Sequence, residues 1–373
     1  MAHTPSIPPT PAEDAGWHRS RRAGAARRRL AVLGGLLAGA LGLAACSSSG
    51  GTAQAASRQT TQRVPLVVYS AKNYMPGVGT AFTKKTGIPV ELVNHSTGTL
   101  LAKIQAERSD PQWGLLWIDG AAACAALDQQ GMLLRGFEPD TGQLTSLGKE
   151  LVPADHSDVP TAVTIAGALV YNPKVLPDPP SSFSQLTEPQ YRGKVGMNNP
   201  AISGPTYTFV AGLMNQLGGV GPGEAFFERL AANGLQVFST NKVTLTALLQ
   251  GRIAMAIVQN NAGIEFAEKY PQLKVVYPTA ATLLPSVICI DSHAPKAEVA
   301  EAKEFADYVY SPAGQAVMKA VNPYGGWPIM QGVTPAPLLP ALSSLPVQKI
   351  ATRTWGAREA SITQWFSEHV VNG

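Results

Sequence analysis

Between residues 64 and 129, short apolar runs alternate with stretches of helical periodicity, and this alternation most constrains the fold. The apolar runs cover residues 64–70, 90–93 and 115–118. The helical stretches cover residues 78–86, the segment from about 97 to 108, and residues 121–129. Alternating strands and helices are typical of an open parallel sheet. Such sheets bind ligands beyond the carboxyl ends of their strands, so we expect a site there.

Small polar residues follow the ends of these predicted strands. They are Ser70 and Ala71, then Ser96, Thr97, Gly98 and Thr99, and finally Asp119. The first N–H groups of a helix carry partial positive charge, so the second turn favours a small anion. The alternative is an ordinary helix cap, in which a hydroxyl accepts a bond from the backbone. Asp119 can likewise receive an amino group of the ligand or cap its own helix.

The same arrangement recurs in the second half of the chain. Three further strand-to-helix junctions there carry Ser203, Gly204 and Thr206, then Asn241, and then Asn260. One such turn by itself indicates a cap, but several in two α/β halves favour a cleft lined by N–H and hydroxyl donors. We therefore predict that these residues contact the ligand together with those of the first half.

Later segments are expected to complete the two halves. Residues 161–171 are apolar and β-branched, and two predicted strands at 273–278 and 286–290 are expected to cross back to the first half. Residues 297–309 and 312–321 have amphipathic helical periodicity. The loop 322–328 holds two aromatic residues and is either a surface turn or the rim of a cleft.

The first 45 residues have the pattern of an export signal. Six arginines precede an apolar segment at residues 30–45, which is too short to span a bilayer comfortably. The segment ends in Leu43-Ala44-Ala45-Cys46, which resembles the lipobox of bacterial lipoproteins. The resemblance implies cleavage before Cys46, a lipid on its thiol, and anchoring to the outer face of the bacterial membrane. The export route, general or twin-arginine, stays open.

The charge of the remaining chain excludes one class of partner. The chain has 29 basic and 25 acidic residues, and residues 1–46 hold six of the basic and two of the acidic ones. This leaves 23 of each sign, so no basic patch indicates nucleic acid. The remaining residues are enough for two lobes. We predict a signal at 1–45, a flexible tether at 46–63, lobe 1 at 64–162, lobe 2 at 163–280, and a return to lobe 1 with C-terminal helices at 281–373. Whether Cys124 and Cys289 form a disulfide stays open.

Several motifs resemble the extracellular solute-binding proteins of ABC importers. They are VVYSAKN, NHSTGTLLAKIQAE, ALVYNPKVLP, YRGKVGMNNPAISGPTYTF and YVYSPAGQAVM, and the resemblance covers residues 66–333. Within that family, the chain is similar to the group that includes ferric-iron, 2-aminoethylphosphonate and sugar-phosphate binders. The resemblance implies the two-lobed, type II periplasmic-binding-protein fold, an α/β fold in which each lobe is a mixed sheet flanked by helices. It also implies two hinge crossings, a small anionic solute in the interlobe cleft, and a membrane permease as partner.

One departure bears on the ligand. Iron binders of this group carry adjacent tyrosines, whereas here Tyr308 and Tyr310 are separated by Val309. We therefore expect a phosphonate or phosphate ester, no metal and no cofactor, with ferric iron as the alternative. An exported hydrolase is a further alternative, but the chain has no G-x-S-x-G or H-E-x-x-H motif. We expect a monomer that binds without catalysing a reaction.

Overall fold

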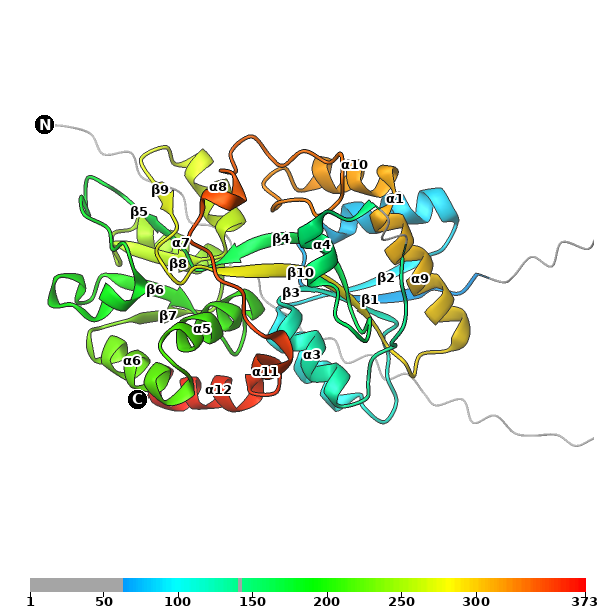
Figure 1. Ribbon diagram of the computed structural model, residues 1–373, viewed down its shortest axis with the longest axis horizontal. Coiled ribbons are helices and arrows are strands. Elements are labelled where there is room, and N and C mark those ends of the chain that lie inside the picture. Colours follow the sequence, from blue (N-terminus) through cyan, green and yellow to red (C-terminus); the bar gives the residue numbers. More distant parts are fainter. Residues whose placement is uncertain (1–62, 140–142) are drawn as a thin grey trace, which may run out of the picture. The chain divides into compact units, whose positions relative to one another are not determined.

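The computed structural model describes residues 63–139 and 143–373, which form two mixed β-sheets flanked by helices. Figure 1 shows the first sheet in one half of this region and the second sheet in the other, with β4 and β10 side by side between them. The export signal, Cys46 and the tether lie outside the described residues. The predicted fold class is confirmed, whereas the predicted lobe boundaries stay a prediction.

The first sheet has the strand order β2-β1-β3-β10-β4. Strands β1, β2 and β3 are parallel, and β10 is antiparallel to both of its neighbours. The bounds are β1 Leu66–Ser70, β2 Val90–Asn94, β3 Leu115–Asp119, β4 Val159–Ala166 and β10 Thr282–Ile290. Strand β10 is buried along its whole length, as expected for an inner strand covered on both faces, and β4 is almost entirely buried although it ends the strand order.

The second sheet has the strand order β7-β6-β8-β5-β9. Strand β6 is parallel to β7 and β8, and β5 is antiparallel to β8 and β9. The bounds are β5 Ala168–Tyr171, β6 Val195–Asn198, β7 Gln236–Phe238, β8 Met255–Val258 and β9 Lys274–Val276.

The chain passes between the sheets at two places. The apolar run at 161–171 is two strands, because Gly167 between them has a φ of 83° and interrupts the extended backbone. The chain returns between β9 and β10. Our expectation that 273–278 crosses back to the first half is wrong, because β9 pairs with β5 in the second sheet. Only β10 returns, and it begins at Thr282, before the predicted start at residue 286.

Helices cover both sheets and bound the site described below. In the first half they are α1 Met75–Thr86, α2 Thr97–Ala106, α3 Ala121–Gln129 and α4 Ser146–Leu151. The second half holds α5 Gly204–Gln216, α6 Val220–Ala232, α7 Asn241–Leu249 and α8 Asn260–Lys269. The C-terminal part holds α9 Lys296–Tyr310, α10 Pro312–Val321, α11 Thr352–Gly356 and α12 Glu359–Phe366. Short 3₁₀ segments lie at Phe183–Thr187, Pro189–Tyr191 and Leu342–Ser344, and a π-helical turn lies at Ser367–Val371. Within the described ranges, none of these helices is both long and apolar enough to cross a membrane.

Cys124 and Cys289 form a disulfide that ties α3 to β10 across 165 residues of sequence, with Cα atoms 6.3 Å apart. Replacing both cysteines with serine should lower the free energy of unfolding by about 3 kcal/mol, because the cross-link restricts the unfolded chain. Urea unfolding of the variant, compared with the oxidised and the reduced wild type, measures this. Equal midpoints for oxidised and reduced wild type would contradict it.

Candidate functional site

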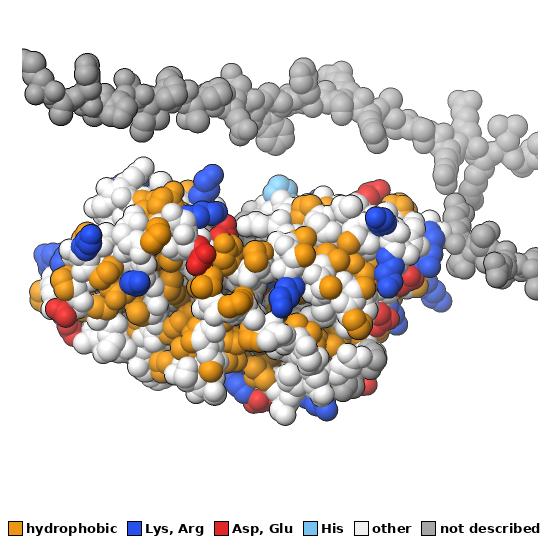
Figure 2. All heavy atoms as spheres, turned by 90° about the horizontal axis from the view of Figure 1, so that it is seen from above, with side chains coloured by type: hydrophobic (Ala, Val, Ile, Leu, Met, Phe, Trp, Pro, Cys, Tyr) orange, Lys and Arg blue, Asp and Glu red, His pale blue; other side chains and the backbone are white. Residues whose placement is uncertain are grey.

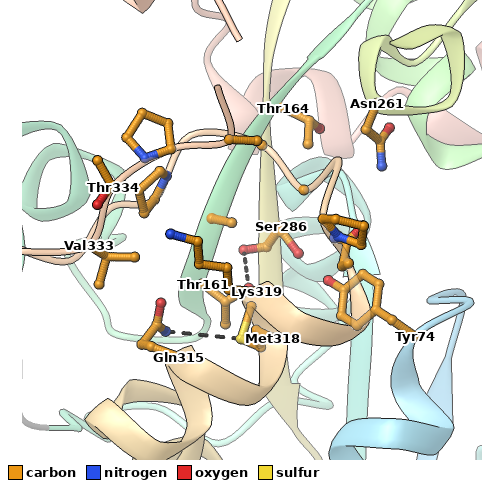
Figure 3. Close-up of a pocket in the computed structure, with 18 of the residues that line it drawn as sticks. Tyr74, Thr161, Thr164, Asn261, Ser286, Gln315, Met318, Lys319, Val333 and Thr334 are labelled. Carbon is orange, nitrogen blue, oxygen red and sulfur yellow. Dashed lines mark hydrogen bonds between the residues drawn. The ribbon is translucent and has the colours of Figure 1, made fainter. Parts of the chain in front are cut away.

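A cavity of about 210 Å³ lies where the first sheet meets α10 and the loop that follows it. Figure 3 shows Tyr74 and Asn261 on one side, Val333 and Thr334 on the other, and Ser286 between them. The cavity combines strand-end residues of the first sheet, residues of β4 and β10, and Asn261 of α8. Both halves of the described structure therefore contribute to it. The lining also includes Lys72, Asp119, Thr161, Ala162, Thr164, Gln315, Met318 and Lys319.

Lys72 is the buried cation of this cavity. It follows β1 by two residues and is 3% exposed. Its ammonium group donates to a carboxylate oxygen of Asp119 and, at 2.6 Å, to the hydroxyl of Ser286. Burial lowers the pKa of the Lys72 ammonium, and the neighbouring Asp119 carboxylate opposes that effect. A buried lysine with two partners is held in position to meet a negatively charged group.

Asp119 connects the two halves of the structure. Its second carboxylate oxygen accepts a hydrogen bond from the Gln259 side chain at 3.0 Å. The same Gln259 amide group also donates to the hydroxyl of Thr164 at 3.0 Å. Gln259 follows β8 of the second sheet, so a chain of hydrogen bonds runs from Lys72 through Asp119 to the second half.

Two other polar groups of the cavity have no partner among the described residues. The exposed Lys319 of α10 makes no ion pair or hydrogen bond there. The side-chain oxygen of Asn261 is buried and accepts no hydrogen bond. The lining side chains include two lysines and one aspartate as the charged groups, which leaves a net charge of +1. This balance favours an anionic ligand.

The predicted helix-start turns lie against each other. Ser96 and Ser203 cap their helices, because each side chain accepts a bond from the backbone N–H three residues later. The N–H of Gly98 donates to the carbonyl of Ile202 at 3.0 Å, and a Cβ added at Gly204 would lie 2.8 Å from the carbonyl of Asp119. The two turns therefore contact each other directly, whereas the repeated pattern predicts a cleft between them. The cavity lies beside them and is not lined by them.

Other predicted contacts are engaged within the protein. The buried Ser70 hydroxyl donates to the carbonyl of Trp117, and the Ala71 N–H donates to the same carbonyl. Asn241 accepts a bond from the Asn198 side chain at 2.6 Å, and Asn260 accepts one from the Ile165 N–H at 2.8 Å. Of the predicted ligand contacts, only Asp119 lines the cavity. The roles of the others toward a ligand stay predictions.

The Ser96→Ala variant tests whether the Ser96 hydroxyl caps α2 or contacts the ligand. We expect a loss of about 1 kcal/mol in the free energy of unfolding, because the variant leaves a backbone N–H of α2 unpaired. Ligand affinity should change less than about threefold, since the cavity is not lined by Ser96. Urea unfolding and calorimetric titration measure the two quantities. A large loss of affinity with unchanged stability would instead place the ligand on this turn.

The structure adds residues that we did not single out from the sequence, namely Lys72, Ser286, Asn261 and Lys319. The sequence could have indicated Lys72, because it lies just beyond the end of a predicted strand. It could not have indicated Ser286, which faces the site only because β10 pairs with β3 and places Ser286 opposite Asp119. For the loop 322–328 both readings apply. Its residues Asn322, Pro323, Gly325, Gly326 and Pro328 line the cavity, whereas Trp327 is buried and donates to the carbonyl of Pro340.

The sequence model of the bacterial extracellular solute-binding proteins matches residues 78–346. The chain belongs to this family. A curated relative of this chain comes from Salmonella typhimurium. It is named a putative 2-aminoethylphosphonate-binding periplasmic protein. The two are 26% identical over 269 residues, which are 69% of this chain and 74% of the relative.

Solved structures share the fold of this solute-binding protein. AfuA from Actinobacillus pleuropneumoniae, with fructose-6-phosphate bound, has a TM-score of 0.73 at 19% identity and covers 83% of this chain and 99% of its own. Iron-bound HitA from Pseudomonas aeruginosa has a TM-score of 0.70 at 21% identity, covering 81% and 98%. The chain is thus the solute-binding protein of an ABC importer, with an extracytoplasmic location, and its relatives are binding proteins rather than enzymes.

Proposed function

We propose that this solute-binding protein captures a small phosphonate or phosphate ester in the cavity and delivers it to the membrane permease. The observation that carries the proposal is the net charge of +1 at the cavity, built from buried Lys72, unpaired Lys319 and Asp119. Lys72 would donate to the anionic oxygens, with the Ser286 hydroxyl beside it. The protein binds the solute without converting it, and we expect it to act as a monomer.

Asp119 gives a reason to prefer ligands that also carry an amino group. Its carboxylate is shared between Lys72 and Gln259. A ligand with an ammonium and a phosphonate group would bond to both members of the Lys72–Asp119 pair, so that neither is left buried without a partner. The name of the Salmonella relative agrees with this chemistry.

Iron has less support in this cavity. Among the lining residues, only Asp119 and Tyr74 could supply an anionic oxygen, which Fe(III) prefers. Burial raises the pKa of the Tyr74 phenol, so the phenolate form is disfavoured. Among residues 63–139 and 143–373, no group of three or more His, Cys, Asp and Glu side chains is placed to hold a metal ion.

A thermal-shift screen, followed by calorimetric titration, tests the proposal. The compounds are methylphosphonate, 2-aminoethylphosphonate, fructose-6-phosphate, inorganic phosphate and Fe(III). A ligand at about 100 times its Kd stabilises the folded state by about 2.7 kcal/mol, which raises the melting temperature measurably. We expect the organic phosphonates or the phosphate ester to give this shift and to be recovered intact. A shift with Fe(III) alone would refute the anion assignment.

We also propose that the protein is anchored to the membrane by lipid on Cys46, after removal of residues 1–45. The support is the Leu43-Ala44-Ala45-Cys46 motif, which lies in the part of the chain that the structure does not describe. Cys46→Ala should abolish the incorporation of labelled palmitate and move the protein from the membrane fraction to the soluble fraction. Unchanged labelling and fractionation would exclude this anchor.

A further inference from the structure

One wall of the cavity is apolar. It is formed by the end of α10 and the segment that follows the loop 322–328, and Figure 3 shows its Val333 and Thr334 across the cavity from Tyr74 and Asn261. We call it the apolar wall. Its apolar members are Met318, Pro328, Val333, Pro335, Ala336 and Pro337. Figure 2 shows the face that carries α8 and α10, where hydrophobic side chains form a broad area in the middle of the molecule.

The apolar wall is held in place from behind. Met318 and Val333 are partly buried and pack against the core of the first sheet, which also contains Phe305 and Val309 of α9. The prolines have a fixed φ, so their positions cost little conformational entropy when a ligand binds. Met318 has a flexible thioether that adapts to the shape of what it contacts. Such a wall suits an apolar group better than water.

The cavity is larger than the smallest phosphonates require. An apolar cavity of about 150 Å³ holds a benzene molecule, which has six carbon atoms. The cavity here is about 210 Å³. Methylphosphonate, with one carbon, would engage Lys72 and Ser286 and leave the apolar wall uncovered.

We propose that the natural solute is a phosphonate or phosphate ester which, besides any amino group that meets Asp119, has an apolar alkyl or aryl substituent of up to about six carbons. The anionic group lies at Lys72 and the substituent lies against Met318 and Val333. This inference rests on the proposed function, because the binding of the anionic group at Lys72 is what directs the substituent toward the apolar wall.

Calorimetric titration of the purified protein with methyl-, propyl-, butyl- and phenylphosphonate tests the proposal. A fully buried methylene group contributes about fourfold in affinity. We therefore expect butylphosphonate to bind at least about tenfold more tightly than methylphosphonate. Val333→Thr, which replaces one methyl group by a hydroxyl, should lower that ratio about fivefold. The matched control is Val175→Thr, because Val175 is 61% exposed and lies outside the cavity, and it should keep the wild-type ratio.

The outcomes separate this inference from the proposed function. If methylphosphonate binds and the longer phosphonates bind no more tightly, the apolar substituent is overturned and the phosphonate function stands. If neither the phosphonates nor the phosphate ester of the thermal-shift screen binds, both are overturned. Thermal unfolding verifies that Val333→Thr is folded, and Met318→Gln is the second variant if it is not. A ratio unaffected by both substitutions would also overturn the inference.

Discussion

Replacing Lys72 with methionine should weaken phosphonate binding on the order of a thousandfold, about 4 kcal/mol. Methionine has a similar length, but it has no charge and no N–H group. Lys72 is 3% exposed, so water cannot take its place beside the ligand anion. The Asp119 carboxylate would also lose its cation and repel the approaching anion. Calorimetric titration with methylphosphonate and 2-aminoethylphosphonate measures the loss.

Two further variants make this test specific. Lys269→Met removes the same charge from an exposed ion pair with Glu265 on α8, and should leave the affinity unchanged. The double variant Lys72→Met, Asp119→Asn removes both charges of the ion pair, so it should recover most of the stability that the single variant loses. It should not recover the affinity. If the double variant binds methylphosphonate as tightly as the wild type, Lys72 does not bind the anion.

Asp158→Asn should stabilise the protein, and the gain should grow as the pH rises from about 4.5 to about 8. Asp158 is 6% exposed, and one of its carboxylate oxygens has no partner among the described residues. Burial, together with the nearby Asp155 and Asp128 carboxylates, raises the pKa of Asp158 to about 8. Between its pKa in the unfolded chain and this value, only the unfolded chain releases the proton, so the stability of the wild type falls with rising pH.

Asparagine cannot ionise and removes this cost, which at about pH 8 is on the order of 4 kcal/mol. Urea unfolding at the two pH values measures the difference between variant and wild type, in which the titration of all other groups cancels. Asp110→Asn is the matched control, because Asp110 is exposed, and its effect should be small at both values. A gain of equal size at both pH values would show that Asp158 is ionised in the folded protein.

Local patterns in the sequence predicted most strands of the first half and the helices α2 and α5 that begin at the two hydroxyl-rich turns. The turns at Ser96 and Ser203 both combine hydroxyl residues with glycine, and both serine hydroxyls cap helices, as short polar residues before a helical stretch indicate. The sequence could not show that these turns contact each other directly. That contact depends on Gly98, where a Cβ would overlap the carbonyl of Ala201.

The cavity itself was harder to predict, because it depends on contacts between distant segments. Ser286 is central in an apolar strand and reaches Lys72 only because β10 pairs antiparallel with β3. Lys319 lies on an amphipathic helix, where a lysine ordinarily indicates a solvated face. Among the predicted ligand contacts, Asp119 alone lines the cavity, because it ends a strand at the sheet edge where parallel sheets bind ligands.

The position of β10 has a consequence for the order of folding. All five strands of the second sheet lie within residues 168–276, so they are available before the last quarter of the chain is made. The first sheet begins much earlier, at Leu66, yet its strand between β3 and β4 ends only at Ile290. During synthesis from the N-terminus, the sheet that starts first is therefore completed last. Cys124 stays without its disulfide partner until Cys289 has been made.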